Sequence, residues 1–336
     1  MATSIAARMP FDILAMIFEI CAADDWRIPL RVGAVCRCWR TAVQSSPRAW
    51  RVVNMNTRRE CHNLYFHRSG SYNLHVAMKS PYSINNIIQV AHRVQCLTTS
   101  YFVENVESAT FPVLTTLRMF RFSKYKIDEE DQSLGAHLIT TPRFPNLRHL
   151  EIHSIYTGPI PDDFPPLKSL QIVASEAEWV EFVAACNDSL VSPQITYDHS
   201  FTDPERNSVE LPNLRLFKYT KKIDEDVQSP FELRTPSLQV YIEDANIRNQ
   251  SELLHEDVST VTYMRLQRLH SGLSTEALKR VRVLQLEAAF GDFCDALDEL
   301  QKDPFLCYRL ERLEFHSGFM DAEELDTAHE MLEEFE

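Results

Sequence analysis

The chain has 336 residues, of which 44% are hydrophobic and 24% are charged, and its formal net charge at pH 7 is −14. This composition predicts a globular protein with room for one large domain or two, and the negative charge argues against non-specific binding to nucleic acid. The seven glycines are scattered, with no two closer than Gly272 and Gly291. Glycine-rich phosphate loops and the nucleophile elbow of hydrolases are therefore excluded.

The charge is unevenly distributed along the chain. Residues 1–60 hold nine basic and five acidic residues, whereas residues 285–336 hold three basic and sixteen acidic ones. The eight cysteines are too sparse for a disulfide scaffold, which favours free thiols and a cytoplasmic or nuclear location. No window approaches the roughly 18 apolar residues of a membrane span, so we expect no membrane partner.

The first fifty residues predict short amphipathic helices. A helix beginning at Pro10 has one apolar face and a second apolar stripe at Ile13, Ile17 and Ile20, so it must be covered on two sides. A second helix begins near Pro29 and continues its apolar spacing to Val43. Two short helices cannot bury enough surface to fold alone, and another surface must therefore cover them.

The residues of this segment follow a specific order. Met9-Pro10 is followed by Ile13-Leu14, Ile17-Phe18, Pro29-Leu30, Val35-Cys36-Arg37-x-Trp39-Arg40 and Ser46-Pro47-Arg48-Ala49-Trp50. Residues 8–52 thereby resemble the F-box, a three-helix motif, in the version abundant in mushroom-forming fungi. The chain departs from that family at Met9, where leucine is usual, and at Phe11-Asp12, where Pro-x-Glu is common.

The resemblance implies a partner for the exposed side of these helices. F-box proteins bind the Skp-type adaptor of Skp–cullin–F-box ubiquitin ligases, and through it a cullin. Carried over residue by residue, the adaptor contact would use Pro10, Phe11, Leu14, Ile17, Val35, Cys36 and Trp39. The alternative is that these residues form an internal helical core packed on the rest of the chain.

A recurring apolar pattern follows, in which one apolar residue precedes two more by three and five positions. Clear copies begin at Leu114, Leu147, Leu167, Leu214, Val261, Val281 and Leu310, and weaker ones at Leu74, Val94 and Leu238. Most intervals lie in or near the period of about 20 to 29 residues of leucine-rich repeats, in which the last two apolar residues share one face of a short strand. The region resembles the irregular leucine-rich repeats found behind many F-boxes.

These patterns together predict an α/β fold. We expect a small N-terminal three-helix F-box at 1–52, an irregular leucine-rich-repeat solenoid arc at 53–320, and an acidic amphipathic capping helix at 321–336. The Asn or Cys that usually follows each strand of such repeats is missing, so we expect longer excursions at 120–143 and 176–210. Helices are predicted between strands at 176–186, 251–258, 274–281 and 290–300.

Few residues suggest a catalytic or metal-binding role. His149, Glu151 and His153 share the open face of one predicted strand, but a solvent-facing trio needs no metal, and Cys36 and Cys38 diverge on a helix. We expect no metal, no cofactor and no catalysis. Side chains between the buried strand residues are the candidates for substrate binding: Arg118, Phe120, His149, Glu151, His153, Lys218, Tyr263, Arg265, Glu287, Arg312, Glu314 and His316.

The resemblance predicts a substrate-recognition subunit of a Skp–cullin–F-box E3 ubiquitin ligase. The F-box would dock on the adaptor while the repeats bind a protein substrate for ubiquitin-dependent degradation. The chain would raise the effective concentration of the substrate near the ubiquitin-charged enzyme and would catalyse no reaction itself. One alternative is a protein-binding scaffold that contains the F-box and repeats but joins no ligase. Another is an enzyme whose site is assembled from loops.

Overall fold

The computed structural model describes twelve stretches of the chain: residues 9–79, 84–99, 109–120, 136–153, 160–174, 179–197, 207–221, 231–245, 260–266, 278–287, 290–303 and 305–316. The chain divides into two compact units. Unit 1 comprises Met1–Glu151 with Asp163–Pro165, and unit 2 comprises Ile152–Asp162 with Pro166–Glu336.

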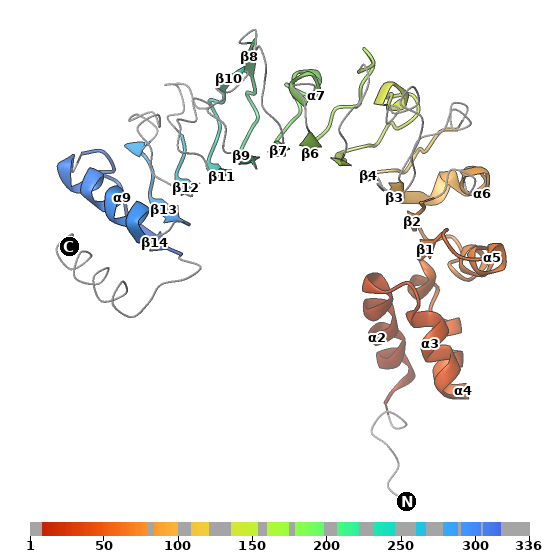
Figure 1. Cartoon of the computed structure of the whole chain (residues 1–336). Coiled ribbons are helices and arrows are strands. Elements are labelled where there is room, and N and C mark those ends of the chain that lie inside the picture. The colour runs from red at the N-terminus through yellow and green to blue at the C-terminus, as the bar shows by residue number, and fades with distance from the viewer. Residues whose placement is uncertain are drawn as a thin grey trace, which may run out of the picture. The chain divides into compact units, whose positions relative to one another are not determined.

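Unit 1 begins with three short α-helices and a 3-10 turn. They are α2 (Phe11–Asp24), α3 (Ile28–Val35), α4 (Arg37–Gln44) and η1 (Pro47–Trp50). The three α-helices contact one another and lie side by side (Figure 1). Pro10 precedes α2 and Pro29 lies in the first turn of α3, positions where the missing amide hydrogen costs nothing. The Cys36 sulfur accepts a hydrogen bond from the Trp39 amide (3.5 Å) and so caps α4.

A buried aromatic cluster joins these helices to the next part of the chain. The Trp50 ring packs edge-on against Tyr65, with 5.0 Å between ring centroids. Tyr65 lies on α5 (Arg59–Arg68), and its hydroxyl donates to the Trp26 carbonyl. The Trp50 indole N–H donates to the Val43 carbonyl (2.7 Å). The N-terminal helices therefore share their core with α5.

Parallel strands follow in chain order in unit 1. They are β1 (Val52–Asn54), β2 (Leu74–Ala77), β3 (Val94–Thr99) and β4 (Thr116–Phe120), followed by β5 (His149–His153), whose first three residues belong to this unit. Helical segments between strands are α6 (Ile84–Ile88), η3 (Ala91–Arg93) and η6 (Ala136–Leu138). Burial alternates along the strands: Leu74 and Val76 are buried, and His75 between them is exposed on the open face.

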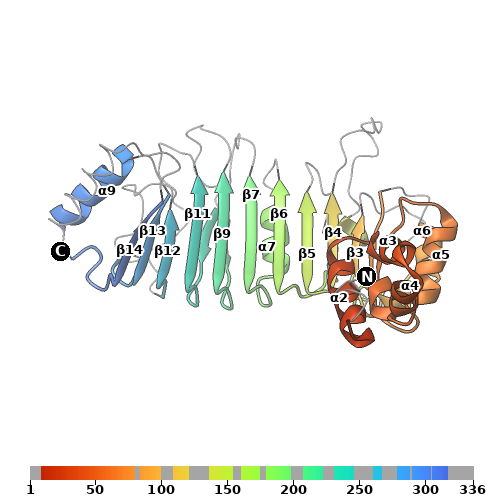
Figure 2. The same cartoon turned by 90° about the horizontal axis from the view of Figure 1, so that it is seen from below.

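Unit 2 continues the parallel arrangement. Its strands are β6 (Ser169–Ala174), β7 (Ser192–Tyr197), β9 (Leu216–Lys221), β11 (Val240–Ala245), β12 (Tyr263–Leu266), β13 (Val283–Leu286) and β14 (Arg312–Phe315). They lie side by side and point the same way (Figure 2). Two further strands, β8 (Asn207–Glu210) and β10 (Phe231–Arg234), pair with each other in a separate sheet. The helices are α7 (Trp179–Ala185), which contacts β6 and β8, and α9 (Phe290–Lys302).

The apolar triplets seen in the sequence form the core of the strands. Leu117 and Met119 on β4, for example, are fully buried together with the preceding Leu114. The triplets that begin at Leu147, Leu167, Leu214, Val261 and Val281 are buried in the same way, and the last one, Leu310, Leu313 and Phe315, is partly exposed. The period-2 alternation of these residues therefore predicts the strands correctly.

Strand β7 lies where the sequence predicted a long excursion, so that prediction is wrong for 192–197. Leu190, Pro193 and Ile195 are buried with the same spacing as the other triplets. Proline occupies the middle position, and because proline is not read as a strand residue, the pattern was hidden.

The predicted architecture is wrong beyond its general α/β class. A three-helix F-box followed by a solenoid arc of irregular leucine-rich repeats is not what the described residues form. They form one twelve-stranded parallel sheet, in the order β1-β2-β3-β4-β5-β6-β7-β9-β11-β12-β13-β14, with seven α-helices. The sheet starts at Val52, directly after η1, and Trp50 packs on α5. Packing between residues distant in sequence leaves no periodic signal. The sequence pattern therefore placed the N-terminal helices and the strands in separate domains, whereas in the structure they pack on each other.

Some predictions concern residues outside the described ranges. The capping helix at 321–336, the helix at 251–258 and most of the helix at 274–281 are among them. The helices predicted at 176–186 and 290–300 correspond to α7 and α9. The domain boundaries at 52 and 320 stay predictions.

Candidate protein-binding surfaces

Helix α2 buries one narrow stripe and exposes the rest of its apolar residues. The buried residues are Leu14, Phe18 and Ala22, which follow one another at intervals of four and so share one face. The exposed large apolar side chains on α2 and α3, which we call the exposed apolar group, are Phe11, Ile13, Met16, Ile17, Ile20, Leu30 and Val35. Ile20 and Val35 are 63% and 61% exposed. A helix with this pattern is covered on one side only.

The predicted adaptor-binding residues divide into two sets. Pro10, Phe11, Ile17, Val35 and Cys36 are exposed. Leu14 is buried, and the half-buried Trp39 lies against Phe18 with 5.3 Å between ring centroids, so these two side chains hold the helices together. Sequence reasoning did not include Ile13, Met16, Ile20 and Leu30 in the contact, although the second apolar stripe on the first helix was visible.

Exposed arginines accompany the exposed apolar group. Arg31 forms an ion pair with Asp25 (2.9 Å), and the Arg40 Nε donates to the Gly33 carbonyl (2.7 Å). Arg27 and Arg37 are also exposed. The surface of these helices therefore combines apolar side chains with positive charge, a mixture typical of protein interfaces.

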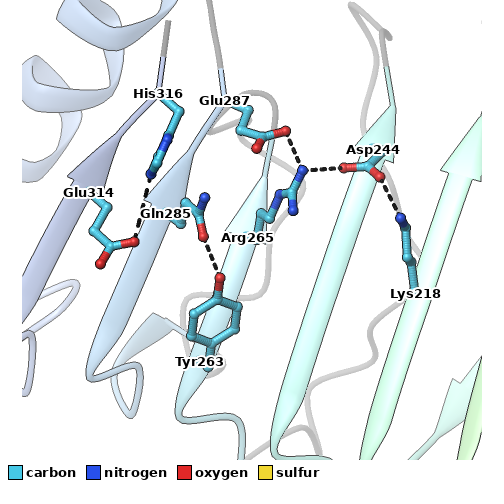
Figure 3. Close-up of polar contacts among 8 residues, drawn as sticks. All are labelled: Lys218, Asp244, Tyr263, Arg265, Gln285, Glu287, Glu314 and His316. Carbon is cyan, nitrogen blue, oxygen red and sulfur yellow. Dashed lines mark hydrogen bonds and ion pairs between the residues drawn. The ribbon is translucent and has the colours of Figure 1, made fainter. Parts of the chain in front are cut away.

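The open face of unit 2 carries a row of cross-strand ion pairs (Figure 3). Lys218 on β9 contacts Asp244 on β11 (Nζ to Oδ2, 3.2 Å), and Asp244 also faces Arg265 on β12 (3.7 Å). Arg265 pairs in turn with Glu287, directly after β13. We call these four residues the charge ladder. Because two cations alternate with two anions, the ladder is neutral in sum.

Other predicted substrate-binding residues lie beside the charge ladder. The Tyr263 hydroxyl donates to the Gln285 side-chain oxygen. Arg312 and His316 both face Glu314, at 2.8 and 3.8 Å. Tyr263, Gln285, Glu314 and His316 lie near one another in Figure 3, and each has a polar partner among these residues. The contact between Tyr263 and Gln285 joins β12 to β13, and such cross-strand pairs stabilise a sheet. Arg312, Glu314 and His316 instead lie on or directly after β14, and their pairing leaves little net charge to attract a ligand.

The open face of unit 1 has a different electrostatic character. Arg118 on β4 pairs with Glu151 on β5 (3.0 Å), and Arg51, just before β1, places Nη2 3.2 Å from Nε2 of His75. His75 is exposed as a whole residue, but desolvation of its ring by neighbouring groups, followed by the charges of Arg51 and Arg118, lowers its pKa. His149 on β5 is exposed. Phe120 and His153, also predicted as binding residues, are half-buried.

Arg51 and His75 were missed by sequence reasoning. The signal for His75 was its place between Leu74 and Val76, two apolar residues of a weak copy of the triplet pattern. Arg51 gave no such signal, because it precedes a strand of only three residues.

Neither a metal site nor a membrane helix is found in the described ranges. No group of three His, Cys, Asp or Glu side chains there could hold a metal ion, and no helix there combines the length and hydropathy needed to cross a bilayer. Comparisons of the chain with protein-family models, curated proteins and solved structures find no match. The function is therefore argued from the two surfaces themselves.

Proposed function

We propose that this chain is the substrate-recognition subunit of a Skp–cullin–F-box type E3 ubiquitin ligase, and that α2 and α3 bind a Skp-type adaptor. The observation that carries the proposal is the exposed apolar group. Its residues fall within 8–52, the segment whose order of proline, apolar pairs and Cys-Arg-x-Trp-Arg resembles the F-box.

The energetics of the exposed apolar group favour a protein partner. Seven large apolar side chains on two short helices are partly open to water, and monomeric proteins rarely keep contiguous apolar patches of this kind exposed. Burying one such side chain completely contributes about 1.5 to 3 kcal/mol. The side chains here are 36 to 63% exposed, so each would gain a part of that on binding. The exposed arginines would add charge complementarity where they meet acidic residues of a partner.

The sheet supplies the second half of the function. Its open face presents charged and aromatic side chains on rigid strands, which suits recognition of another protein. A substrate held there would be kept near the ubiquitin-charged enzyme of the ligase, so that transfer gains from a high effective concentration. This chain would do no bond chemistry itself.

The test is retention of a purified Skp-type adaptor on the immobilised full chain. The wild type is expected to retain it, and Ile17→Asp and Val35→Asp are expected to abolish retention, because each places a charge among apolar contacts. Both side chains are exposed, so the variants should fold. Phe305→Asp is the matched control, since Phe305 is 77% exposed outside these helices. A wild type that retains no adaptor overturns the proposal.

A cullin added after the adaptor separates the ligase subunit from the scaffold alternative. Recovery of adaptor and cullin together supports the ligase subunit. Recovery of the adaptor with no cullin overturns that role in favour of a protein-binding scaffold.

A further inference from the structure

Basic side chains gather on the open face of the sheet in unit 1. We call Arg51, His75, Arg118 and His149 the basic face. His75, Arg118 and His149 are exposed and Arg51 is half-buried. They come from four different places along the chain, next to or on β1, β2, β4 and β5. Only the pairing of the strands brings them together.

The strand register places small side chains between the residues of the basic face. His75 is paired with Cys96 on β3, and Cys96 with Thr116 on β4. The His149 amide donates to the carbonyl of Thr115 (3.0 Å), which continues the same row to β5. Arg118 stands opposite Thr98, two residues further along. Since neighbouring strands lie about 4.8 Å apart, Cys96 and Thr116 separate the two histidines by about three strand spacings.

Two positive charges act on His75. After burial, the guanidinium groups of Arg51 and Arg118 are the causes that lower the pKa of His75, which means that a further positive charge is disfavoured there. Glu151 offsets Arg118, but Arg51 and the two histidines lack an acidic partner among the ion pairs of the described residues. The charge ladder of unit 2, in contrast, balances each cation with an anion. The basic face also stands out in a chain whose net charge is −14.

We infer that the basic face binds an acidic segment of a partner protein, through the carboxylates of Asp and Glu side chains. The inference rests on the proposed function in one respect, since the partner would be the ligase substrate. The planar guanidinium of arginine matches a carboxylate with two parallel hydrogen bonds. The small side chains of Cys96, Thr98 and Thr116 lie between His75 and His149 in the strand register and would let an extended peptide come close to the sheet.

The probe is an alternating Glu-Ala peptide labelled with fluorescein, and the matched control is the Gln-Ala peptide of the same length. Fluorescence anisotropy with the full chain at neutral pH is expected to show at least about tenfold tighter binding of the Glu peptide, equivalent to about 1.4 kcal/mol. Raising the salt from about 50 to about 300 mM is expected to weaken that binding, since exposed charges are screened. Equal affinity for the two peptides overturns the inference.

Variants locate the binding on the sheet. Arg118→Gln and Arg51→Gln are each expected to weaken binding of the Glu peptide at least about fivefold, as for a charge contact of moderate strength. Arg282→Gln is the matched control, because Arg282 is an exposed arginine in unit 2 that pairs with Glu311. Equal weakening by Arg282→Gln, or binding of a phosphoserine peptide with no binding of the Glu peptide, contradicts the inference. Thermal unfolding of each variant shows that it is folded.

The adaptor assay distinguishes this inference from the proposed function. Arg118→Gln leaves the exposed apolar group untouched, so adaptor retention should equal that of the wild type. In the wild type, no preference for the Glu peptide together with normal adaptor retention would overturn the inference alone. A clear preference for the Glu peptide with no adaptor retention would overturn the proposed function alone.

Discussion

The hydroxyl of Tyr241 donates a hydrogen bond of 2.7 Å to Oε2 of Glu243 inside the core of unit 2. Both residues lie on the buried face of β11, at 0% and 3% exposure. Together with Leu238 they have the spacing of the apolar triplets, and Glu243 stands where neighbouring strands have Tyr219 and Leu266. A carboxyl group is therefore held in the core, and Tyr241 is one of the groups that hold it.

We expect Tyr241→Phe to destabilise the protein by about 1 to 3 kcal/mol, the cost of removing a donor from a buried polar group. Urea denaturation followed by circular dichroism measures the change. Tyr263→Phe is the control, because its hydroxyl is on the half-buried open face; its effect should be smaller, since water can replace the lost partner. A Tyr241→Phe change no larger than the control would show that this hydrogen bond contributes little.

We expect stability to fall as the pH drops below about 6.5, in part because of His62. Burial lowers the pKa of this side chain below its ordinary value of 6.5. The unfolded chain then takes up a proton at a higher pH than the folded one, so the stability present above pH 6.5 is lost progressively toward the folded-state pKa. Urea midpoints at about pH 7.5 and about pH 5.5 should differ less for His62→Gln than for the wild type. His67→Gln, on the exposed side of α5, is the control. An unchanged pH dependence in His62→Gln would contradict the prediction.

We expect Arg265 to be the central residue of the charge ladder. It faces both Asp244 and Glu287, whereas Lys218 faces Asp244 in the pairs described. Arg265→Met should cost about 1 to 2 kcal/mol and Lys218→Met less than about 1 kcal/mol, values reduced because all these side chains are partly exposed and screened. A double-mutant cycle with Glu287→Gln measures the coupling. Additive effects of the two substitutions would show that the pair is energetically independent.

We expect the two sides of α2 to respond differently to truncation. Phe18→Ala removes a buried ring that packs on Trp39 and should cost about 3 to 5 kcal/mol. Ile20→Ala removes a side chain that is 63% exposed and should change stability by less than about 0.5 kcal/mol. Thermal unfolding measures both. A large loss in Ile20→Ala would mean that this face is packed within the chain, which would also weaken the case for an adaptor.

The sequence predicted most strands correctly because their signal is local. Leu117 and Met119, or Leu284 and Leu286, alternate with polar residues, and that alternation directly reports a strand with one buried face. The signal failed at β7, where Pro193 takes an apolar position, and it was weak at β11, where Glu243 does. In both cases the tertiary environment accepts a residue whose type argues against a buried strand.

The candidate sites were predicted only in part, for a related reason. Alternation places Lys218, Arg265 and Arg118 on the open face without structural information. Which of them meet an anion depends on the register between strands, and this register is set by packing far from each residue in sequence. The sequence therefore named several of these side chains, although not Arg51, His75 or Asp244, and it could not separate the balanced charge ladder from the basic face.

The aromatic contact between Trp50 and Tyr65 has a practical consequence for mapping partners by deletion. A fragment that ends at residue 52 would lose α5, and with it the ring that covers Trp50 and the hydroxyl that holds the Trp26 carbonyl. The newly exposed indole of Trp50 would make this fragment bind non-specifically in any binding assay, whatever its natural partner. A longer fragment that lacked the first fifty residues would lose Trp50, and the Tyr65 ring would then be exposed to water. Single substitutions on exposed side chains are therefore the sound route to the partners of this protein.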